Sequence, residues 1–205
     1  MKCSIIRGLL QIKETMVTRQ ARRKDEQYLI QAKQRYDKQR QRNVAAVAGV
    51  HEFVVVLDNL KGGFNVPKIF RSAEAFGAHS VHLINVDWFD PAPAKGSFRK
   101  VPAEFHEEFA SCYNALIEQG YTLYMLAAES VENTVPSISY EVALPSKSAF
   151  ILGHEAKGHS FSVDDFPAVK KLSIPHFGSV ESLNVSIAAS IVMYECVRQH
   201  NCNDK

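Results

Sequence analysis

The chain has 205 residues, of which 46% are apolar and 22% are charged, which is ordinary for a globular protein and long enough to bury a sizeable core. No stretch approaches the ~18 apolar residues of a membrane span. The N-terminus also lacks the features of an export signal, so we expect no membrane association.

The net charge of +2 is unevenly distributed. Residues 1–42 carry 12 Lys/Arg and 4 Asp/Glu, a balance of +8, whereas the remainder carries 12 Lys/Arg and 18 Asp/Glu, a balance of −6. A basic arm on an acidic body favours a polyanion partner such as RNA, although a merely solvated helix would have the same composition.

The four cysteines are scattered without the spacing of metal ligands: Cys3, Cys112, Cys196 and Cys202. This usage is typical of a reducing compartment, and we expect the protein to be cytoplasmic. Cys196 falls in an apolar segment, which predicts a buried thiol.

Residues 1–43 form the basic N-terminal extension. Its densest part, RQARRKDEQYLIQAKQRYDKQRQRN, contains no Gly or Pro and is rich in good helix formers. Tyr28, Ala32 and Tyr36 recur every four residues, so we predict a helix of about five turns with a thin apolar stripe that docks on the body or on RNA. Met1 and Met16 both stand as candidate starts of the chain.

Residues 44–205 are expected to form one α/β domain, because apolar strand-like runs alternate with helical segments. The predicted strands are 53–57, 81–84, 121–126, 149–152 and 171–174, the predicted helices are 66–76, 103–119 and 183–199, and 91–102 is a predicted loop. This order favours a mainly parallel sheet flanked by helices. In such sheets ligands bind at the carboxyl ends of the strands, where three segments stand out.

The first segment is DNLKGGFNVPKIFRSAEAFG, which follows the first strand. A Gly-Gly turn precedes Asn65, and Arg71 is expected close to the positive end of the following helix. Cations favour the opposite end of a helix, so this position favours an anion-binding role for Arg71. Pairing with Glu74 or Asp58 is the alternative.

The second segment is ILGHEAKGHS. Gly153 and Gly158 allow the backbone to approach a ligand closely, and Glu155 between them is a candidate to accept hydrogen bonds. An ordinary turn has the same pattern. His154 and His159 have no third ligand at a recognisable spacing, so the sequence predicts no metal site.

The third segment is IPHFGSVESLNVSIAASIVMYE. Ser182 and Asn184 lie where a helix begins, beside Gly178, and either suits a helix cap. The helix itself is apolar on almost every side, which predicts burial on more than one face.

Taken together and in order, the three segments resemble the SpoU (TrmH-like) family of RNA ribose 2′-O-methyltransferases in the SPOUT superfamily. The resemblance covers about residues 53–200. It implies a SPOUT-type α/β fold with a C-terminal trefoil knot, S-adenosylmethionine as cofactor, transfer RNA or ribosomal RNA as substrate, and a homodimer formed through the C-terminal helix.

The resemblance also implies roles for individual residues. The cofactor pocket would be lined by Gly153, Ile174, His176 and Leu183. Arg71 would hold the phosphate beside the target hydroxyl, while Asn65, Glu155, Ser182 and Asn184 orient the nucleotide and Arg71. The chain departs from the family at His154 and His159, and at Pro67 in the first segment.

Two other classes of protein are also compatible with the sequence. A non-catalytic RNA-binding or assembly factor with the same fold would also explain the basic arm. A dinucleotide-dependent enzyme would share the doubly wound sheet, but the glycine pattern that cradles a pyrophosphate is missing.

Overall fold

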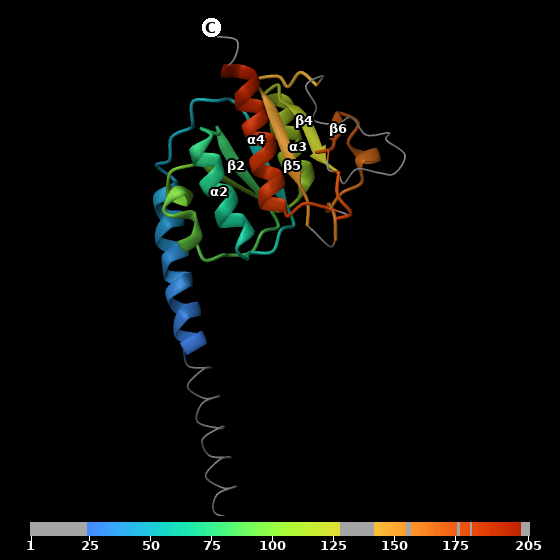
Figure 1. The fold of residues 1–205 in the computed structure, drawn as a ribbon. Coiled ribbons are helices and arrows are strands. Elements are labelled where there is room, and N and C mark those ends of the chain that lie inside the picture. The colour runs from blue at the N-terminus through green and yellow to red at the C-terminus, as the bar shows by residue number, and fades with distance from the viewer. Residues whose placement is uncertain (1–23, 128–141, 155–156, 176, 181, 202–205) are drawn as a thin grey trace, which may run out of the picture.

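The structure is a computed structural model that describes residues 24–127, 142–154, 157–175, 177–180 and 182–201. Strands and helices alternate along the body (Figure 1). The strands are β1 (Val54–Asp58), β2 (Ser80–Ile84), β3 (Ala103–His106), β4 (Thr122–Leu126), β5 (Ser148–Leu152) and β6 (Val169–Leu172). The helices are α2 (Asn65–Ala75), α3 (Phe109–Glu118) and α4 (Val185–Asn201), with short 3-10 helices at Ala92–Ala94, Ser97–Arg99 and Val163–Asp165.

The six strands form one sheet in the order β3-β2-β1-β5-β4-β6, and every neighbouring pair is parallel. The expected parallel α/β fold is therefore confirmed. The central strand β1 has the sequence VVVLD and is buried throughout, as a strand covered on both faces must be.

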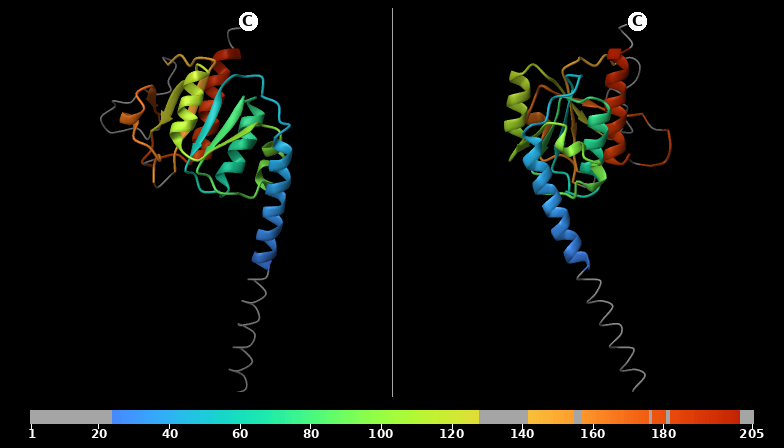
Figure 2. Two further views of the ribbon diagram at one scale, coloured as in Figure 1. Left: turned by 180° about the vertical axis from the view of Figure 1, so that it is seen from behind. Right: turned by 90° about the vertical axis from the view of Figure 1, so that its left-hand side faces the viewer.

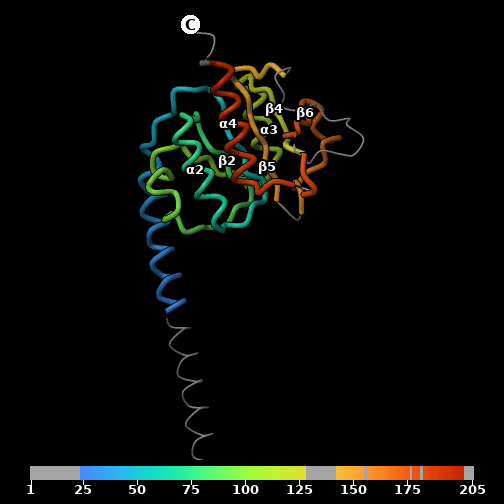
Figure 3. Tube along the Cα trace, viewed as in Figure 1, coloured from blue at the N-terminus to red at the C-terminus, as the bar shows by residue number. Residues whose placement is uncertain are grey.

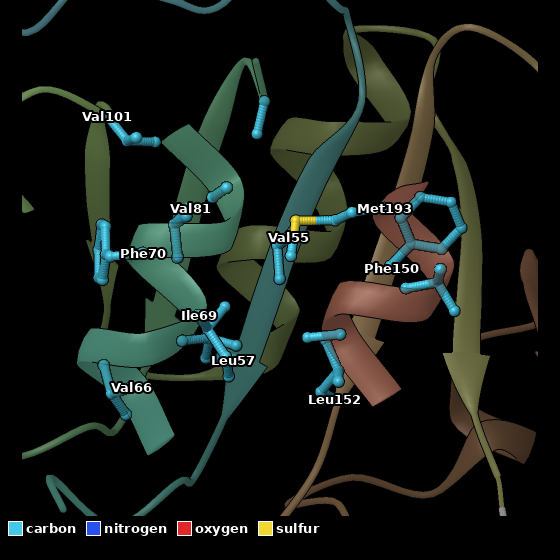
Figure 4. Packing of buried hydrophobic residues seen from close by; sticks show 14 of the residues in the cluster. Val55, Leu57, Val66, Ile69, Phe70, Val81, Val101, Phe150, Leu152 and Met193 are labelled. Carbon is cyan, nitrogen blue, oxygen red and sulfur yellow. The ribbon is translucent and has the colours of Figure 1, made fainter. Parts of the chain in front are cut away.

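Alternate residues of the central strands belong to two separate cores. Val55 and Leu57 point into one apolar cluster with α2 and α4, whereas Val54 and Val56 belong to the other, with α3. In Figure 4 the side chains of Val55 and Leu57 lie between α2 and α4. The views in Figure 2 show the resulting three layers, with α2 and α4 on one side of the sheet and α3 on the other.

One predicted helix is wrong at its beginning. Residues 103–119 were expected to be helical, but Ala103–His106 forms β3, which pairs with β2 at the edge of the sheet, and α3 begins only at Phe109. The short edge strand lacks a clear alternation of apolar residues, so its local sequence favours a helix and its pairing with β2 overrides that preference. The glycines predicted to end helices, Gly77 and Gly120, do adopt positive φ.

The described part of the basic extension is helical over residues 24–43 and lies against the body beside the segment that follows β2 (Figure 3). Of the predicted stripe, Ala32 and Tyr36 are buried, and the Tyr36 ring stacks on Phe98 at 5.5 Å between centroids. Asn43 closes the contact, since its side-chain amide donates to the carbonyls of Phe98 and Val101.

Among the described residues, none of the helices combines the length and the apolarity that a bilayer crossing requires. The predicted trefoil knot involves chain outside the described residues and stays a prediction.

Candidate functional site

A cavity of about 290 Å³ lies at the carboxyl edge of the sheet. It is bounded by the ends of β4 and β5, by the segment after β6 and by the first residues of α4. Its lining is mostly apolar and consists of Met125, Leu126, Ala127, Leu152, Gly153, His154, Gly158, His159, Ile174, Ser182, Leu183, Val185 and Ala188. The volume is at the lower end of the ~300–1,000 Å³ typical of small-molecule sites.

Glycine at position 153 is required by the close approach of the loop that follows β5. A Cβ atom at Gly153 would lie 2.8 Å from Nδ1 of His159 and 2.9 Å from the carbonyl of Gly158. Backbone hydrogen bonds of 2.8 Å in both directions between His154 and Gly158 close this loop. Gly158 has a φ of +70°, which disfavours any other residue. Both glycines therefore shape the loop, and both line the cavity.

A buried carboxylate holds the far end of the same loop. Asp58, at the end of β1, accepts hydrogen bonds of 2.6 Å from both the amide and the hydroxyl of Ser160. Nε2 of His159 lies 3.3 Å from the carbonyl oxygen of Leu126, at the end of β4. These contacts fix the loop against two strands, so the cavity wall is built before any ligand binds.

Asn184 both caps α4 and reaches across to α2. Its Oδ1 accepts hydrogen bonds from the amide (3.0 Å) and the hydroxyl (2.6 Å) of Ser186, which is the geometry of a helix cap. Its Nδ2 donates to Oδ1 of Asn65 at 3.2 Å. Of the two predicted caps, Asn184 is therefore the one that acts, and α4 begins later than predicted. Ser182 precedes the helix and lines the cavity.

Arg71 is exposed on α2 and is not part of the cavity wall. It is the seventh residue of a helix that begins at Asn65, so it lies nearer the middle of α2 than predicted, where the positive end of the helix dipole has little effect on it. Among the described residues, the two alternative partners are engaged elsewhere: Glu74 pairs with Lys100 at 2.8 Å and Asp58 with Ser160.

The predicted site residues thus fall into three groups. Gly153, Ile174, Leu183 and Ser182 meet in the cavity wall, the Asn65–Asn184 pair links α2 to the cap of α4, and Arg71 lies exposed on α2. Glu155 and His176 lie outside the described residues. The roles assigned to all of these residues stay predictions.

Strand β4 contributes to the site in a way that the sequence did not predict. Met125, Leu126 and Ala127 line the cavity because β4 pairs with β5 in parallel and both strands end at the same edge. The signal was present, since any strand beside the one that ends in Gly153 contributes its carboxyl end. Identifying β4 as that neighbouring strand requires the order of the strands in the sheet, which the sequence alone did not provide.

The sheet is entirely parallel, a preformed and largely apolar cavity lies at its carboxyl edge, and a pair of amides lies next to that cavity. These features define an α/β protein that binds a small organic ligand. The family model described as "SpoU rRNA Methylase family" matches residues 52–194. The chain therefore belongs to the SpoU methylase family, as the three segments indicated.

Two relatives illustrate the range of the family. The chain is 28% identical over 151 residues to a tRNA (guanosine(18)-2′-O)-methyltransferase of Thermus thermophilus, a match that covers 72% of this chain and 75% of the relative. It is 30% identical over 162 residues to the 23S rRNA (guanosine-2′-O-)-methyltransferase RlmB of Xanthomonas axonopodis, with 76% of this chain and 62% of the relative covered.

Solved structures agree with this assignment. The TrmH/SpoU tRNA modifying enzyme of A. aeolicus superposes with a TM-score of 0.65 over 84% of this chain and 85% of that chain; its 22% identity makes this a likeness of fold. The SpoU methyltransferase AviRb of Streptomyces viridochromogenes, determined in complex with AdoMet, is 25% identical with a TM-score of 0.61, and the match covers 74% of this chain and 59% of that chain.

Proposed function

We propose that this protein transfers a methyl group from S-adenosylmethionine to a ribose 2′-hydroxyl of transfer RNA or ribosomal RNA. The observation that carries the proposal is the preformed cavity at Gly153, Ile174 and Leu183, in a member of the SpoU family, with the Asn65–Asn184 pair between α2 and α4.

The cavity suits S-adenosylmethionine in its chemistry. Leu152, Ile174, Leu183 and Val185 supply apolar surface for a purine ring, and Gly153 and Gly158 bring backbone groups to the wall that can form hydrogen bonds. When bound, the cofactor supplies a methyl group on a positively charged sulfonium. We assign Gly153, Ile174, Leu183 and His176 to the cofactor site.

We assign Arg71 to the RNA. A guanidinium stays protonated in proteins and is a poor base, so its contribution is to clamp a phosphate beside the target ribose and to hold the 2′-oxygen in line for attack. A phosphate oxygen then takes the hydroxyl proton. The exposure of Arg71 on α2 suits a ligand as large as RNA.

The remaining polar residues act as positioning groups. The Asn65–Asn184 hydrogen bond fixes the first turn of α2, six residues before Arg71, against the beginning of α4. Ser182 lies in the cavity wall, two residues before Asn184. Together with Glu155 these groups orient the target nucleotide and Arg71.

We propose that the basic extension, residues 1–43, supplies sequence-independent attraction to the RNA backbone, and that residues 44–205 form the methyltransferase domain. The cations Lys38, Arg40 and Arg42 are exposed on the described helix. Contacts of this kind weaken steeply as salt rises. Lys95, Arg99 and Lys100, which follow β2, extend the basic surface.

We also propose a homodimer formed through α4. One face of α4 is buried in the core, through Val185, Ala189, Val192, Met193 and Cys196. Within one chain the opposite face stays open, with Ile187 53% and Tyr194 57% exposed. Burial on more than one face, which the sequence predicted, would then come from a second copy.

The proposed location is the cytoplasm, since Cys112 and Cys196 are buried free thiols, which suits a reducing compartment.

Mapping of 2′-O-methylated positions in RNA from cells with and without the protein tests the function and identifies the substrate. At least one ribose methyl should disappear in its absence and return with the wild-type gene. Calorimetry distinguishes the enzyme from a non-catalytic assembly factor. Binding of RNA without any binding of S-adenosylmethionine would favour the assembly factor and contradict the proposal.

A further inference from the structure

Two histidines and a cysteine meet on the face of the sheet that α3 covers. His82 comes from β2, His106 from the end of the edge strand β3, and Cys112 from α3. Their potential ligand atoms all lie within 4.8 Å of one another. None of the three lines the cavity proposed for the cofactor.

The donor atoms are arranged around Nδ1 of His82. This atom lies 3.0 Å from Nε2 of His106, 3.6 Å from Sγ of Cys112 and 3.7 Å from a carboxylate oxygen of Glu104. In a tetrahedral zinc site, with Zn–N near 2.0–2.1 Å and Zn–S near 2.3 Å, neighbouring ligand atoms lie roughly 3.3–3.7 Å apart. The two imidazole nitrogens, which now share a hydrogen bond, would have to separate and turn toward an ion, and the half-exposed carboxylate of Glu104 would have to move in to complete the site.

From this juxtaposition we propose that His82, His106 and Cys112, with Glu104 as the fourth ligand, bind a divalent metal ion of the zinc class. Two imidazoles and a thiolate suit zinc and disfavour magnesium or calcium, which prefer oxygen ligands. Spacing along the sequence could not predict this site, because three different elements supply its ligands.

A serine hydroxyl lies beside the ring nitrogen of each imidazole that faces away from the proposed ion. Oγ of Ser80 lies 3.0 Å from Nε2 of His82, and Oγ of Ser111 lies 3.4 Å from Nδ1 of His106. In protein metal sites the second nitrogen of a histidine ligand usually has such a partner, which fixes the ring and its tautomer. Here Nε2 of His82 and Nδ1 of His106 each lie beside a serine hydroxyl, and the other nitrogen of each ring faces the proposed ion.

The protonation states suit binding with the release of one proton. Burial lowers the pKa of His82 to about 3 and that of His106 below its usual value, so both rings are neutral at pH 7. Burial raises the pKa of Cys112 to about 12, so without an ion it is a thiol. On binding, Cys112 would lose its proton to solvent, and each imidazole would carry its proton on the nitrogen beside a serine, Nε2 of His82 beside Ser80 and Nδ1 of His106 beside Ser111.

An ion would reach the site from the edge of the sheet. A surface depression lined by Phe105, His106, Glu107, Glu108 and Ser111 opens beside it, and the acidic side chains there attract cations. Once bound, the ion would tie the edge strand β3 to β2 and α3. We therefore assign it a stabilising role, separate from methyl transfer.

The test uses the full chain, stripped of metal with a chelator and then titrated with Zn²⁺ alone. We expect one zinc ion per chain by calorimetry, tighter binding as pH rises, and a higher melting temperature with zinc. Replacing zinc by Co²⁺ should give the absorption of a thiolate-bound ion. Cys112→Ser and His106→Gln should each weaken binding more than about 100-fold, and Ser80→Ala about tenfold.

Cys196→Ser is the matched control, because Cys196 is equally buried but belongs to the other core. It should bind zinc as the wild type does. The melting temperature of each stripped variant shows whether the variant has folded. Absence of zinc binding by the wild type, or unchanged affinity in folded Cys112→Ser and His106→Gln, would overturn the proposal.

Discussion

The side-chain amide of Asn184 donates a hydrogen bond of 3.2 Å to Oδ1 of Asn65, a residue 119 positions earlier in the chain. The same side chain caps α4 through Ser186. One amide thus fixes the beginning of α4 and links it to the beginning of α2, the helix that carries Arg71. A second link follows about two turns further along each helix, where the hydroxyls of Ser72 and Ser190 lie 2.8 Å apart.

The two functions of Asn184 should separate by mutation. Asn184→Asp keeps an acceptor for the cap but loses the donor to Asn65. We expect its stability to stay close to wild type and its rate of methyl transfer to fall about tenfold, the equivalent of one lost hydrogen bond. Asn184→Ala should lose both functions and about 1 kcal/mol of unfolding free energy. Denaturant unfolding and single-turnover rates measure the two effects, and equal rates for Asn184→Asp and wild type would refute the link.

Arg71→Ala should lower the methyl-transfer rate about 10²–10³-fold, as loss of a group that stabilises charge in the transition state does. Binding of S-adenosylmethionine should not change, because Arg71 is not part of the cavity wall. Lys68→Ala is the control, since Lys68 is an exposed cation on the same helix. Undiminished transfer by Arg71→Ala, or an equal loss with Lys68→Ala, would remove Arg71 from the proposed mechanism.

Gly153→Ala should weaken cofactor binding by more than about tenfold, because the added methyl group meets the backbone of Gly158 and must displace the cavity wall. Gly178→Ala provides the comparison: a Cβ there meets nothing within 4 Å. Calorimetric titration with S-adenosylmethionine measures both variants. If Gly153→Ala binds as tightly as Gly178→Ala, the cofactor does not occupy this cavity.

Docking of the N-terminal helix should weaken in acid. Asp90 accepts hydrogen bonds from Tyr28 (2.7 Å) and Arg35 (2.9 Å). Burial acts to raise the pKa of Asp90, but hydrogen bonds from Arg35, Tyr28 and the amide of Ala92 outweigh it and lower the pKa. A carboxyl with a lowered folded-state pKa stabilises docking above its unfolded pKa of about 3.9, and this contribution disappears as pH falls through the folded value.

Trp88 is the only tryptophan in the chain and lies two residues before Asp90, so its fluorescence reports this transition. Asp90→Asn should mimic the acid state at pH 7 and reduce the free energy of docking by about 1–2 kcal/mol, because solvent screens the partly exposed Arg35. Faster proteolysis of the helix in this variant is expected at pH 7. Identical acid profiles for wild type and Asp90→Asn would exclude Asp90 as the responsible group.

Ile187→Glu should convert the proposed dimer into a monomer, because each interface would bury an uncompensated carboxylate at a cost of roughly 3 kcal/mol or more. Ile117→Glu is the matched control, since Ile117 is a similarly exposed isoleucine (40%) on α3, on the opposite side of the sheet. Sedimentation equilibrium gives the mass of each. A monomeric wild type, or a dimeric Ile187→Glu variant, would contradict an interface through α4.

Local sequence predicted the order of most elements, because each of the buried runs around Val55, Leu83 and Ile151 is continuous and ends at a turn. It failed at Ala103–His106, where pairing with β2 decides the structure, and at Ser182, which lies before α4 rather than in its first turn. Whether a segment forms an edge strand, and where a helix begins, depends on contacts with residues that are distant in the sequence.

The same limit applies to the site. The glycine at position 153 is visible in the sequence, but the reason for it, contact with His159 and Gly158, is not. The contribution of Met125 and Ala127 follows only from the pairing of β4 with β5. The meeting of His82, His106 and Cys112 likewise depends on three elements that only the fold brings together.

Nucleoside analysis after methyl transfer in vitro tests the central claim most directly. The purified protein is incubated with labelled S-adenosylmethionine and RNA from cells that lack it, and the RNA is then digested. We predict label in a 2′-O-methylated nucleoside with the wild-type protein, and at most about a hundredth of that rate with Arg71→Ala. Label on a base, or no label although both RNA and S-adenosylmethionine bind, would contradict the account.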